Sequence, residues 1–406
     1  MRKRPLVVFL DSYSWQAFTD LAGGLRQRGI RVARVGSRTR SPRVLLMQTI
    51  ESWVYGRTRG RVEGGVLLGR PAELSLADLR AAVPQDAADV QMQEDLIGFG
   101  MADAGGPADI SRRVRADVDP RVLVDKWVQG EWAERAGVPT PRTWEGPVSE
   151  EYPVVVKTRV GFGGNGVRVV RDGDALADAW AELTGPDGQP PFLQECLTPS
   201  LHTGGVALDG ETLINVAYDG RPAPDDPTGP PYTVFAVRDA QVVQATERFL
   251  AEIGYTGFFC FDWVADDDGT LKLIDFNSRV FGSWPALQEL GFDFLSAYAH
   301  VLGAGPRPAT SVGRYDEPTT TLRYPCPDTS SREAVERWRD ETHQIVRRRR
   351  SLLGSRWATV IRIRTALGTA RALRKLRGGS GSAPATPDDA AGGRPAGGSL
   401  TSSSAA

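Results

Sequence analysis

The stretch that decides the fold is residues 257–287, GFFCFDWVADDDGTLKLIDFNSRVFGSWPAL. Two apolar runs flank the acidic segment DDDG, and this arrangement predicts an antiparallel hairpin. The second run carries Asp275, Asn277 and Arg279 at alternate positions, so three polar side chains share one face of a strand that its neighbours would bury. Such a face indicates a functional site.

The length of the turn decides which acids meet. With a loop of two or four residues, Asp262 falls on the same face as Asp275 and Asn277, whereas a three-residue loop puts them on opposite faces. Two carboxylates and an amide that converge suit Mg²⁺, which also takes oxygens from substrate phosphates. From the hairpin alone, an exposed strand with solvated acids is an equal alternative. Apolar residues at the other positions favour a sheet packed on a core: Phe258, Phe259, Phe261, Leu273, Ile274 and Phe276.

The composition is that of an ordinary globular protein. The chain has 406 residues, 41% hydrophobic and 24% charged, enough for two or three domains. No apolar run is long enough for a membrane span, and PLVVFL at residues 5–10 is too short for a signal sequence, so we expect a buried strand in a cytoplasmic protein. The cysteines Cys196, Cys260 and Cys326 have no metal or disulfide spacing and are expected to be buried.

The charge is unevenly distributed. Residues 345–377 hold eleven Lys and Arg and no acid, so with a total of −1 the remainder carries −1 − 11 = −12. This is not the overall composition of a nucleic-acid-binding protein. Only five of the 49 basic residues are lysines, which makes each interior lysine notable.

The first 120 residues predict a Rossmann-like α/β domain. We expect a strand at 5–10, a helix over about 14–28, a strand at 30–36, a helix near 74–83 and a strand at 88–93. Neither glycine-rich phosphate fingerprint follows the first strand, so the dinucleotide signature is missing.

A second domain is expected over residues 121–305. It begins with a helix over about 122–136 and continues as strand, glycine-rich loop, strand and helix up to about residue 183, then a strand near 191–197. Residues 306–377 predict an irregular connector followed by a long basic helix from about 331, interrupted or ending by 377. Residues 378–406 are too poor in apolar residues to fold and are expected to be disordered.

Two further segments have residues suited to phosphate. In VVVKTRVGFGGNGVRVV, residues 154–170, Lys157 ends a strand and a glycine-rich loop follows, whose backbone N–H groups can approach a phosphate. An ordinary glycine-rich hairpin turn explains this segment equally well. Lys126, which follows an acid on the expected helix, has an Asp-Lys surface pair as its alternative. The glycines of the loop are Gly161, Gly163, Gly164 and Gly166.

The order of these features along residues 120–303 resembles the ATP-grasp superfamily, whose usual preceding domain matches the Rossmann-like front. The resemblance implies that Lys126 and Lys157 contact ATP phosphates under the glycine loop of Gly163, Gly164 and Gly166. It also implies an adenine pocket in FLQECL, residues 192–197. That pocket would be lined by Gln194, Glu195 and Leu197.

By the same resemblance, two Mg²⁺ ions, or Mn²⁺ in their place, are held by Asp262, Asp275 and Asn277, while Arg279 lies near the transferred phosphate. The chain departs from the family in having Asp275 where a Glu is usual. It also has His202 where an acid often holds the ribose, and a loop histidine explains that residue at least as well.

The resemblance implies a reaction with Lys157 and Arg279 as catalytic residues. ATP would phosphorylate a carboxylate, and an amine such as an amino acid or peptide would attack the acyl phosphate to form an amide or peptide bond. Specialised bacterial biosynthesis is the expected setting. The alternatives are a kinase-like or carboxylating activity, or a degenerate ATP-binding scaffold. The oligomeric state stays open.

The basic arm of residues 345–377 has two interpretations. Leu353, Trp357, Val360 and Leu367 recur at helical spacing among arginines. A helix packed on the acidic body is the first interpretation. Contact with an anionic membrane surface or an acidic partner is the second.

Overall fold

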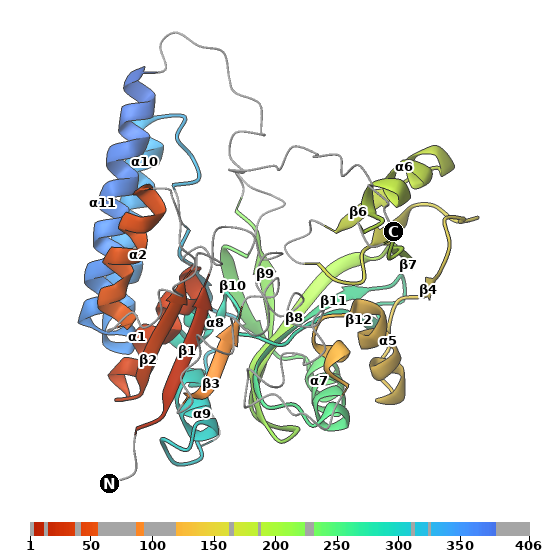
Figure 1. Cartoon of the computed structure of the whole chain (residues 1–406), viewed down its shortest axis with the longest axis horizontal. Helices are drawn as coiled ribbons and strands as arrows, with labels where there is room; N and C mark the ends of the chain where they lie inside the picture. Colours follow the sequence, from red (N-terminus) through yellow and green to blue (C-terminus); the bar gives the residue numbers. More distant parts are fainter. Residues whose placement is uncertain are drawn as a thin grey trace, which may run out of the picture.

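The computed structural model describes residues 4–11, 15–36, 42–55, 87–92, 119–161, 166–185, 188–223, 231–309, 313–323 and 326–378. Within this part of the chain there are three sheets: a parallel front sheet, a long central sheet and a small sheet beyond the central one (Figure 1). The α/β class expected from the sequence is confirmed.

The front sheet is parallel and covered by helices. β1 (Leu6–Asp11) lies between β2 (Arg31–Gly36) and β3 (Ala87–Met92), with α1 (Gln16–Gln27) and α2 (Pro42–Tyr55) as the described helices. Val7, Val8 and Phe9 are fully buried, as befits a parallel sheet that has no solvent face. The expected strands and first helix are confirmed; the helix expected near 74–83 lies outside the described residues.

The central sheet has six strands in the order β12-β11-β8-β9-β10-β13, all antiparallel. Its strands are β8 (Thr198–Leu208), β9 (Glu211–Arg221), β10 (Thr233–Val237), β11 (Gly257–Ala265), β12 (Leu271–Asn277) and β13 (Pro318–Thr320). The three-residue β13 lies in the connector that was expected to be irregular. The expected hairpin is β11 and β12.

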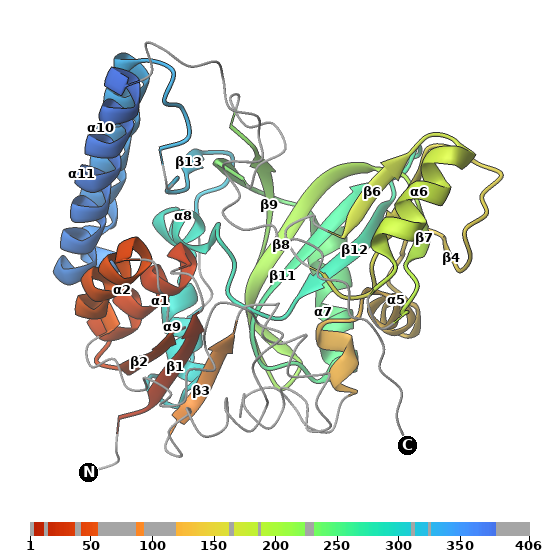
Figure 2. The ribbon, with the colours of Figure 1, turned by 45° about the horizontal axis from the view of Figure 1, so that its top comes forward.

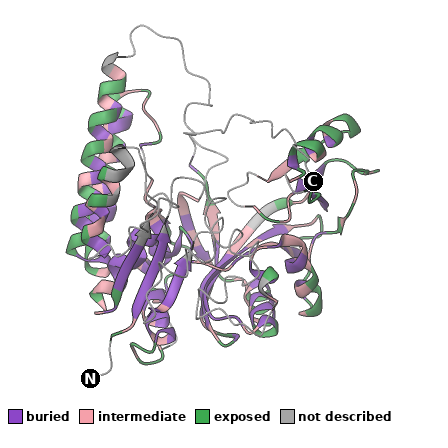
Figure 3. Ribbon diagram, in the orientation of Figure 1, coloured by how far each residue is buried: buried purple, intermediate pink, exposed green. Residues whose placement is uncertain are grey.

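Both faces of β11 are buried, in two different cores. Phe259, Phe261 and Trp263 pack with α7 (Ala240–Ile253) on one face. Phe258 and Cys260 point to the other face, toward α8 (Trp284–Glu289) and α9 (Phe294–Val301). Figure 3 shows buried residues along both the front and the central sheet.

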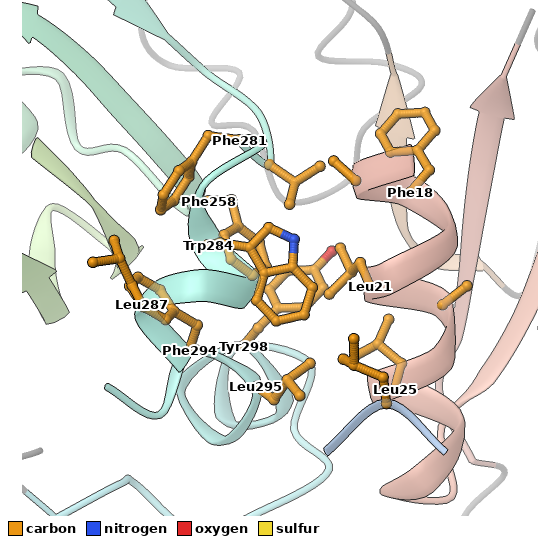
Figure 4. Packing of buried hydrophobic residues seen from close by; sticks show 14 of the residues in the cluster. Phe18, Leu21, Leu25, Phe258, Phe281, Trp284, Leu287, Phe294, Leu295 and Tyr298 are labelled. Carbon is orange, nitrogen blue, oxygen red and sulfur yellow. The ribbon is translucent and has the colours of Figure 1, made fainter. Parts of the chain in front are cut away.

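The front domain and the central sheet share a hydrophobic core. Trp284 is fully buried among Leu21 and Leu25 from α1, Phe258 from β11 and Tyr298 from α9 (Figure 4). Each Å² of apolar surface that is buried contributes about 25 cal/mol, so this contact stabilises the folded protein strongly. The two sheets therefore fold as parts of one body.

The third sheet lies against the end of the β11–β12 hairpin (Figure 2). Its order is β4-β7-β5-β6, and α6 (Gly173–Leu183) packs on it through a core of its own. The expected succession of strand, loop, strand and helix is confirmed. The strands are β4 (Thr143–Trp144), β5 (Val154–Lys157), β6 (Val167–Val170) and β7 (Phe192–Glu195).

The helix expected over 122–136 begins later than the apolar pattern predicts. Residues Pro120–Leu123 form a 3-10 turn, and α5 runs over Lys126–Arg135. Asp125 separates them, because its carboxylate accepts hydrogen bonds from the N–H groups of Trp127 and Val128 and so caps the helix. Lys126 is thereby the first residue of α5.

The basic arm is a pair of long helices packed side by side with α1 and α2 (Figure 1). The helices are α10 (Arg332–Leu353) and α11 (Ser355–Gly378), interrupted at Gly354, whose φ of +96° suits glycine. Trp357 and Val360 are fully buried, and Leu367 is exposed. The apolar side of the arm thus packs on the body, as the first interpretation expects.

Buried polar contacts join the arm to the front domain. Arg364 reaches Glu51 over 2.6 Å, and Arg34 reaches the same carboxylate over 3.0 Å. Trp357 donates its indole N–H to Asp20 over 2.6 Å. Since an unpaired buried charge is costly, these contacts fix the position of the arm on the body.

No helix in the described part of the chain is long and apolar enough to span a bilayer. The described cysteines form no disulfide; Cys260 and Cys326 are buried as expected, and Cys196 is half-buried. The tail from residue 379 onward lies outside the described residues.

Asp20 gives a test of the contact between arm and front domain. Burial raises the pKa of Asp20 to about 6 despite its hydrogen bonds with Trp357 and Gln16. A carboxyl whose pKa is higher in the folded state loses stabilisation as pH rises from its unfolded value of 3.8 to 6. Relative to wild type, Asp20→Asn should therefore gain stability over this window, by at most about 3 kcal/mol.

The measurement is the free energy of unfolding by urea at pH 4, 5, 6 and 8 for both proteins. Asp174→Asn, at an exposed position of α6, is the matched control and should give a flat difference. If the difference in unfolding free energy between Asp20→Asn and wild type also stays constant with pH, the pKa of Asp20 is not raised in the folded protein.

Candidate functional site

The turn of the β11–β12 hairpin does not have the expected length. Next to it, Ala265 pairs with Leu271, which is the register of an odd-numbered loop. The Asp266 N–H donates to the Thr270 carbonyl over 3.1 Å and leaves three residues in the loop. The premise of a two- or four-residue loop is therefore wrong.

A β-bulge at Ile274 restores the register that the site needs. Trp263 pairs with Leu273, but the next residue of β11, Asp262, pairs with Asp275, so Ile274 is the extra residue on β12. Residues directly opposite each other share a face of an antiparallel sheet. The expected convergence of Asp262 and Asp275 is confirmed, through the bulge rather than the turn.

Polar side chains continue this pair into a row across four strands. His202 of β8 lies opposite Asp262, and Tyr218 of β9 lies opposite His202. The His202 Nδ1 is 2.7 Å from Asp262 Oδ1, and its ring stacks on Tyr218 with centroids 5.1 Å apart. The row Asp275, Asp262, His202 and Tyr218 is called the polar row below.

Asn277 and Arg279 lie next to the polar row. Asn277 is two residues beyond Asp275 on the same face, and its Nδ2 is 3.4 Å from Asp262 Oδ2. Arg279 donates from Nη2 to Asn277 Oδ1 over 3.3 Å. The alternate polar positions of β12 thus lie on one face of the sheet, as the sequence predicts.

Two lysines reach β12 from other elements. Lys126, the first residue of α5, places its Nζ 2.5 Å from Asp275 Oδ1. Lys157, at the end of β5, donates to the carbonyl of Ile274 over 2.6 Å, so the bulged residue supplies the acceptor. Lys157 is only 5% exposed. Burial lowers its pKa to about 8, although the negative charge of Asp275 acts to raise it.

The outer edge of β12 is closed by side-chain contacts. Gln129 of α5 donates to the Phe276 carbonyl over 2.9 Å and accepts from the Phe276 N–H over 3.1 Å. The Leu273 N–H donates to Pro139. An edge strand leaves backbone groups unpaired, and these contacts satisfy them. Gln129, Lys272 and Trp15, which contacts Arg279, were not among the residues predicted for the site.

A cavity of about 180 Å³ continues from the polar row between α5, β7 and β12. Gln194 lines it, as expected for an adenine pocket, whereas Glu195, Leu197 and His202 are absent from its lining. The lining residues are Lys126, Trp127, Gln129, Gly130, Glu131, Glu134, Thr140, Thr143, Gln194, Leu273, Ile274 and Asp275.

Glu195 instead takes part in a bridge between two sheets. Lys272 of β12 is 3.4 Å from Glu195 Oε2 at the end of β7 and 3.1 Å from Asp266 Oδ2. The side chain of Lys272 is only 19% exposed. Its signal in the sequence is its rarity, because an interior lysine stands out in an arginine-rich chain.

The glycine-rich loop is described at its two ends. A Cβ at Gly166 would lie 2.0 Å from Thr158 Oγ1, and one at Gly161 would lie 2.8 Å from the same atom. A side chain at either position would therefore force the side chain of Thr158 to move. Gly163 and Gly164 lie outside the described residues.

The carboxylates of the polar row and the neighbouring amide of Asn277 suit a hard divalent cation. Asp262, Asp275 and Asn277 offer two carboxylates and an amide, the donors that Mg²⁺ takes with substrate phosphates. Among the described residues, no three His, Cys, Asp or Glu side chains gather as a complete metal cage. The set fits an ion that is completed by a ligand.

Positive charge stabilises the ionised form of Asp262. Burial alone would raise its pKa, but the hydrogen bond and charge of His202 and the charge of Lys126 outweigh this and lower it. Burial opposes the charged imidazole of His202, yet the hydrogen bond with Asp262 raises its pKa. Each group thus holds the other in its charged form.

Comparison with known proteins identifies the fold of the chain. No family model matches the sequence. Biotin carboxylase of Pseudomonas aeruginosa is 30% identical over 193 residues, which are 39% of this chain and 41% of the carboxylase. The chain thus spans less than half of that relative's length.

Solved structures match over most of the chain. N5-carboxyaminoimidazole synthase from Aspergillus clavatus, in complex with ADP and 5-aminoimidazole ribonucleotide, gives a TM-score of 0.57 at 16% identity over 78% of this chain and 81% of that chain. The chain has the ATP-grasp fold. The biotin carboxylase domain of Hydrogenobacter thermophilus 2-oxoglutarate carboxylase, a dimer with MgADP, ADP and bicarbonate, gives 0.56 at 17% identity over 77% and 73%. The polar row lies on the central sheet of this fold.

Gln129→Leu tests how the edge of β12 is held. The leucine leaves the N–H and carbonyl of Phe276 without their partner, and an unsatisfied buried group costs about 1–3 kcal/mol. We expect the free energy of unfolding in urea to fall by that amount. Gln241→Leu, at an exposed position of α7, should change it by less than about 0.5 kcal/mol. Equal stabilities for the two variants would contradict this account of the edge.

Proposed function

We propose that this protein is an ATP-dependent ligase that joins a carboxylate to an amine through an acyl phosphate. The observation that carries the proposal is the polar row on the central sheet, with Lys126 and Lys157 at one end and Arg279 beside it. Cations from three elements thus gather around two carboxylates, as phosphoryl transfer requires.

Each side chain has a defined task in this proposal. Lys126 and Lys157 bind the phosphates of ATP and neutralise their charge. Asp262, Asp275 and Asn277 hold Mg²⁺, which when bound neutralises the transferred phosphate and polarises its oxygens. Arg279 binds the oxygens of the acid as charge develops on them. The adenine lies in the cavity lined by Gln194.

The glycine-rich loop is proposed to close over the phosphates. The chain enters it directly after β5, whose last residue is Lys157. A closed loop excludes water and protects the acyl phosphate from hydrolysis.

The acid is proposed to be organic and the amine an amino acid or peptide, in cytoplasmic biosynthesis of a specialised product. Bicarbonate is the second candidate acid, favoured by the carboxylases with which the chain shares its fold. In both cases nitrogen attacks the carbonyl carbon of a carboxyl group phosphorylated on oxygen, and the bond from that carbon to the phosphate oxygen breaks to release inorganic phosphate. The two candidates differ only in the acid.

The test is ADP release over a panel of carboxylates, bicarbonate included, each with and without amines. We expect release that requires both an acid and an amine, and an amide or carbamate detected by mass spectrometry. Asp275→Asn and Lys157→Met should each lower the rate at least about 100-fold, since the first removes a carboxylate ligand of the metal and the second a positive charge that binds the phosphate.

The matched control is Asp266→Asn, which changes an aspartate of the same hairpin outside the polar row. It should keep the wild-type rate within about threefold. Calorimetry with Mg-ATP separates the alternatives. Binding without turnover under any acid and amine would indicate a scaffold, and turnover that depends on neither substrate would rule out a ligase.

A further inference from the structure

Arg279 is held from the front domain by an aromatic ring. Its guanidinium carbon lies 4.9 Å from the centre of the Trp15 ring. Trp15 caps the N-terminus of α1, in the front domain, whereas Arg279 follows β12 of the central sheet. The contact therefore joins a domain without a phosphate motif to the polar row.

Trp15 is itself fixed in position. Its ring meets Phe18 edge to face, with centroids 5.0 Å apart, and its carbonyl accepts the N–H groups of Phe18 and Thr19 over 3.1 and 3.3 Å. Phe18 is fully buried in the core that the front domain shares with the central sheet. The half-buried ring is thus held against the shared core through Phe18.

Two hydrogen bonds fix the direction in which the guanidinium plane of Arg279 lies. Nη1 donates to the Val280 carbonyl over 3.1 Å, and Nη2 donates to Asn277 Oδ1 over 3.3 Å. An aromatic ring attracts a cation to its face with about 0.5–2 kcal/mol. Two hydrogen bonds and one ring together restrict a side chain that otherwise has many rotamers.

We propose that Trp15 is a positioning residue that holds the guanidinium of Arg279 toward the polar row. This inference rests on the proposed function, since it gives the front domain a part in the same reaction. A displacement of a catalytic group by about 1 Å can cost up to about 100-fold in rate, so a support of this kind affects turnover without touching ATP.

The experiment compares Trp15→Leu with Trp15→Phe in the full chain, by ADP release with the acid and amine found above. Trp15→Leu should lower kcat about tenfold, while Trp15→Phe, which keeps an aromatic face, should stay within about threefold. The affinity for Mg-ATP should be unchanged in both. Trp53→Leu, at an exposed tryptophan of α2, is the matched control and should match wild type.

A double-mutant cycle shows whether the effect passes through Arg279. In an Arg279→Ala background, Trp15→Leu should cause no further loss. Independent, multiplying losses would overturn the proposal, and so would equal losses for Trp15→Leu and Trp15→Phe.

A second readout does not depend on activity. In NMR spectra of arginine-labelled protein, the Nε–H of Arg279, assigned with Arg279→Lys, should carry a ring-current shift that Trp15→Leu abolishes. A shift that survives Trp15→Leu overturns the proposal. A wild-type protein without ligase activity overturns the proposed function instead, and the shift then still decides whether Trp15 holds the guanidinium.

Discussion

The β-bulge at Ile274 is the feature on which the rest of the site depends. A strand has a side-chain period of two, so one extra residue moves everything beyond it to the other face. Without the bulge, the register set by the turn would put Asp275 on the face opposite Asp262. The extra residue also frees a carbonyl that accepts the buried Lys157. One local irregularity therefore aligns the carboxylates and anchors the lysine from the neighbouring sheet.

The shared core explains why a front domain without a phosphate motif belongs to the same body. Trp284 packs α8 against α1, and the basic arm closes over α1 and α2 through Trp357 and Arg364. The arginines that made the arm resemble a surface-binding helix are partly used inside the protein. The apolar side of the arm is buried against the front domain by the same packing, and its exposed arginines face the solvent.

Much of the fold and part of the site follow from local patterns. The parallel front strands, the hairpin and the polar face of β12 were predicted because burial and alternation leave clear signals at short range. The start of α5 at Lys126 was missed although Asp125 is a recognisable cap, because the apolar pattern begins earlier. The bulge could not be predicted, since it depends on contacts that Pro139, Gln129 and Lys157 make from other elements. Trp15 was missed for the same reason, because no local sequence pattern around it predicts a contact with Arg279.

The short pair of Lys126 and Asp275 has a consequence for the order in which ligands enter. Asp275 already has a cation at 2.5 Å, so under the proposed function a metal ion that arrives alone would have to displace the Lys126 ammonium group from this carboxylate. An ion that arrives with a triphosphate gives Lys126 a new anion in exchange. Under the proposed function, metal and nucleotide would thus be thermodynamically linked: each would lower the free-energy cost of binding the other, and the free protein would discriminate against the bare ion.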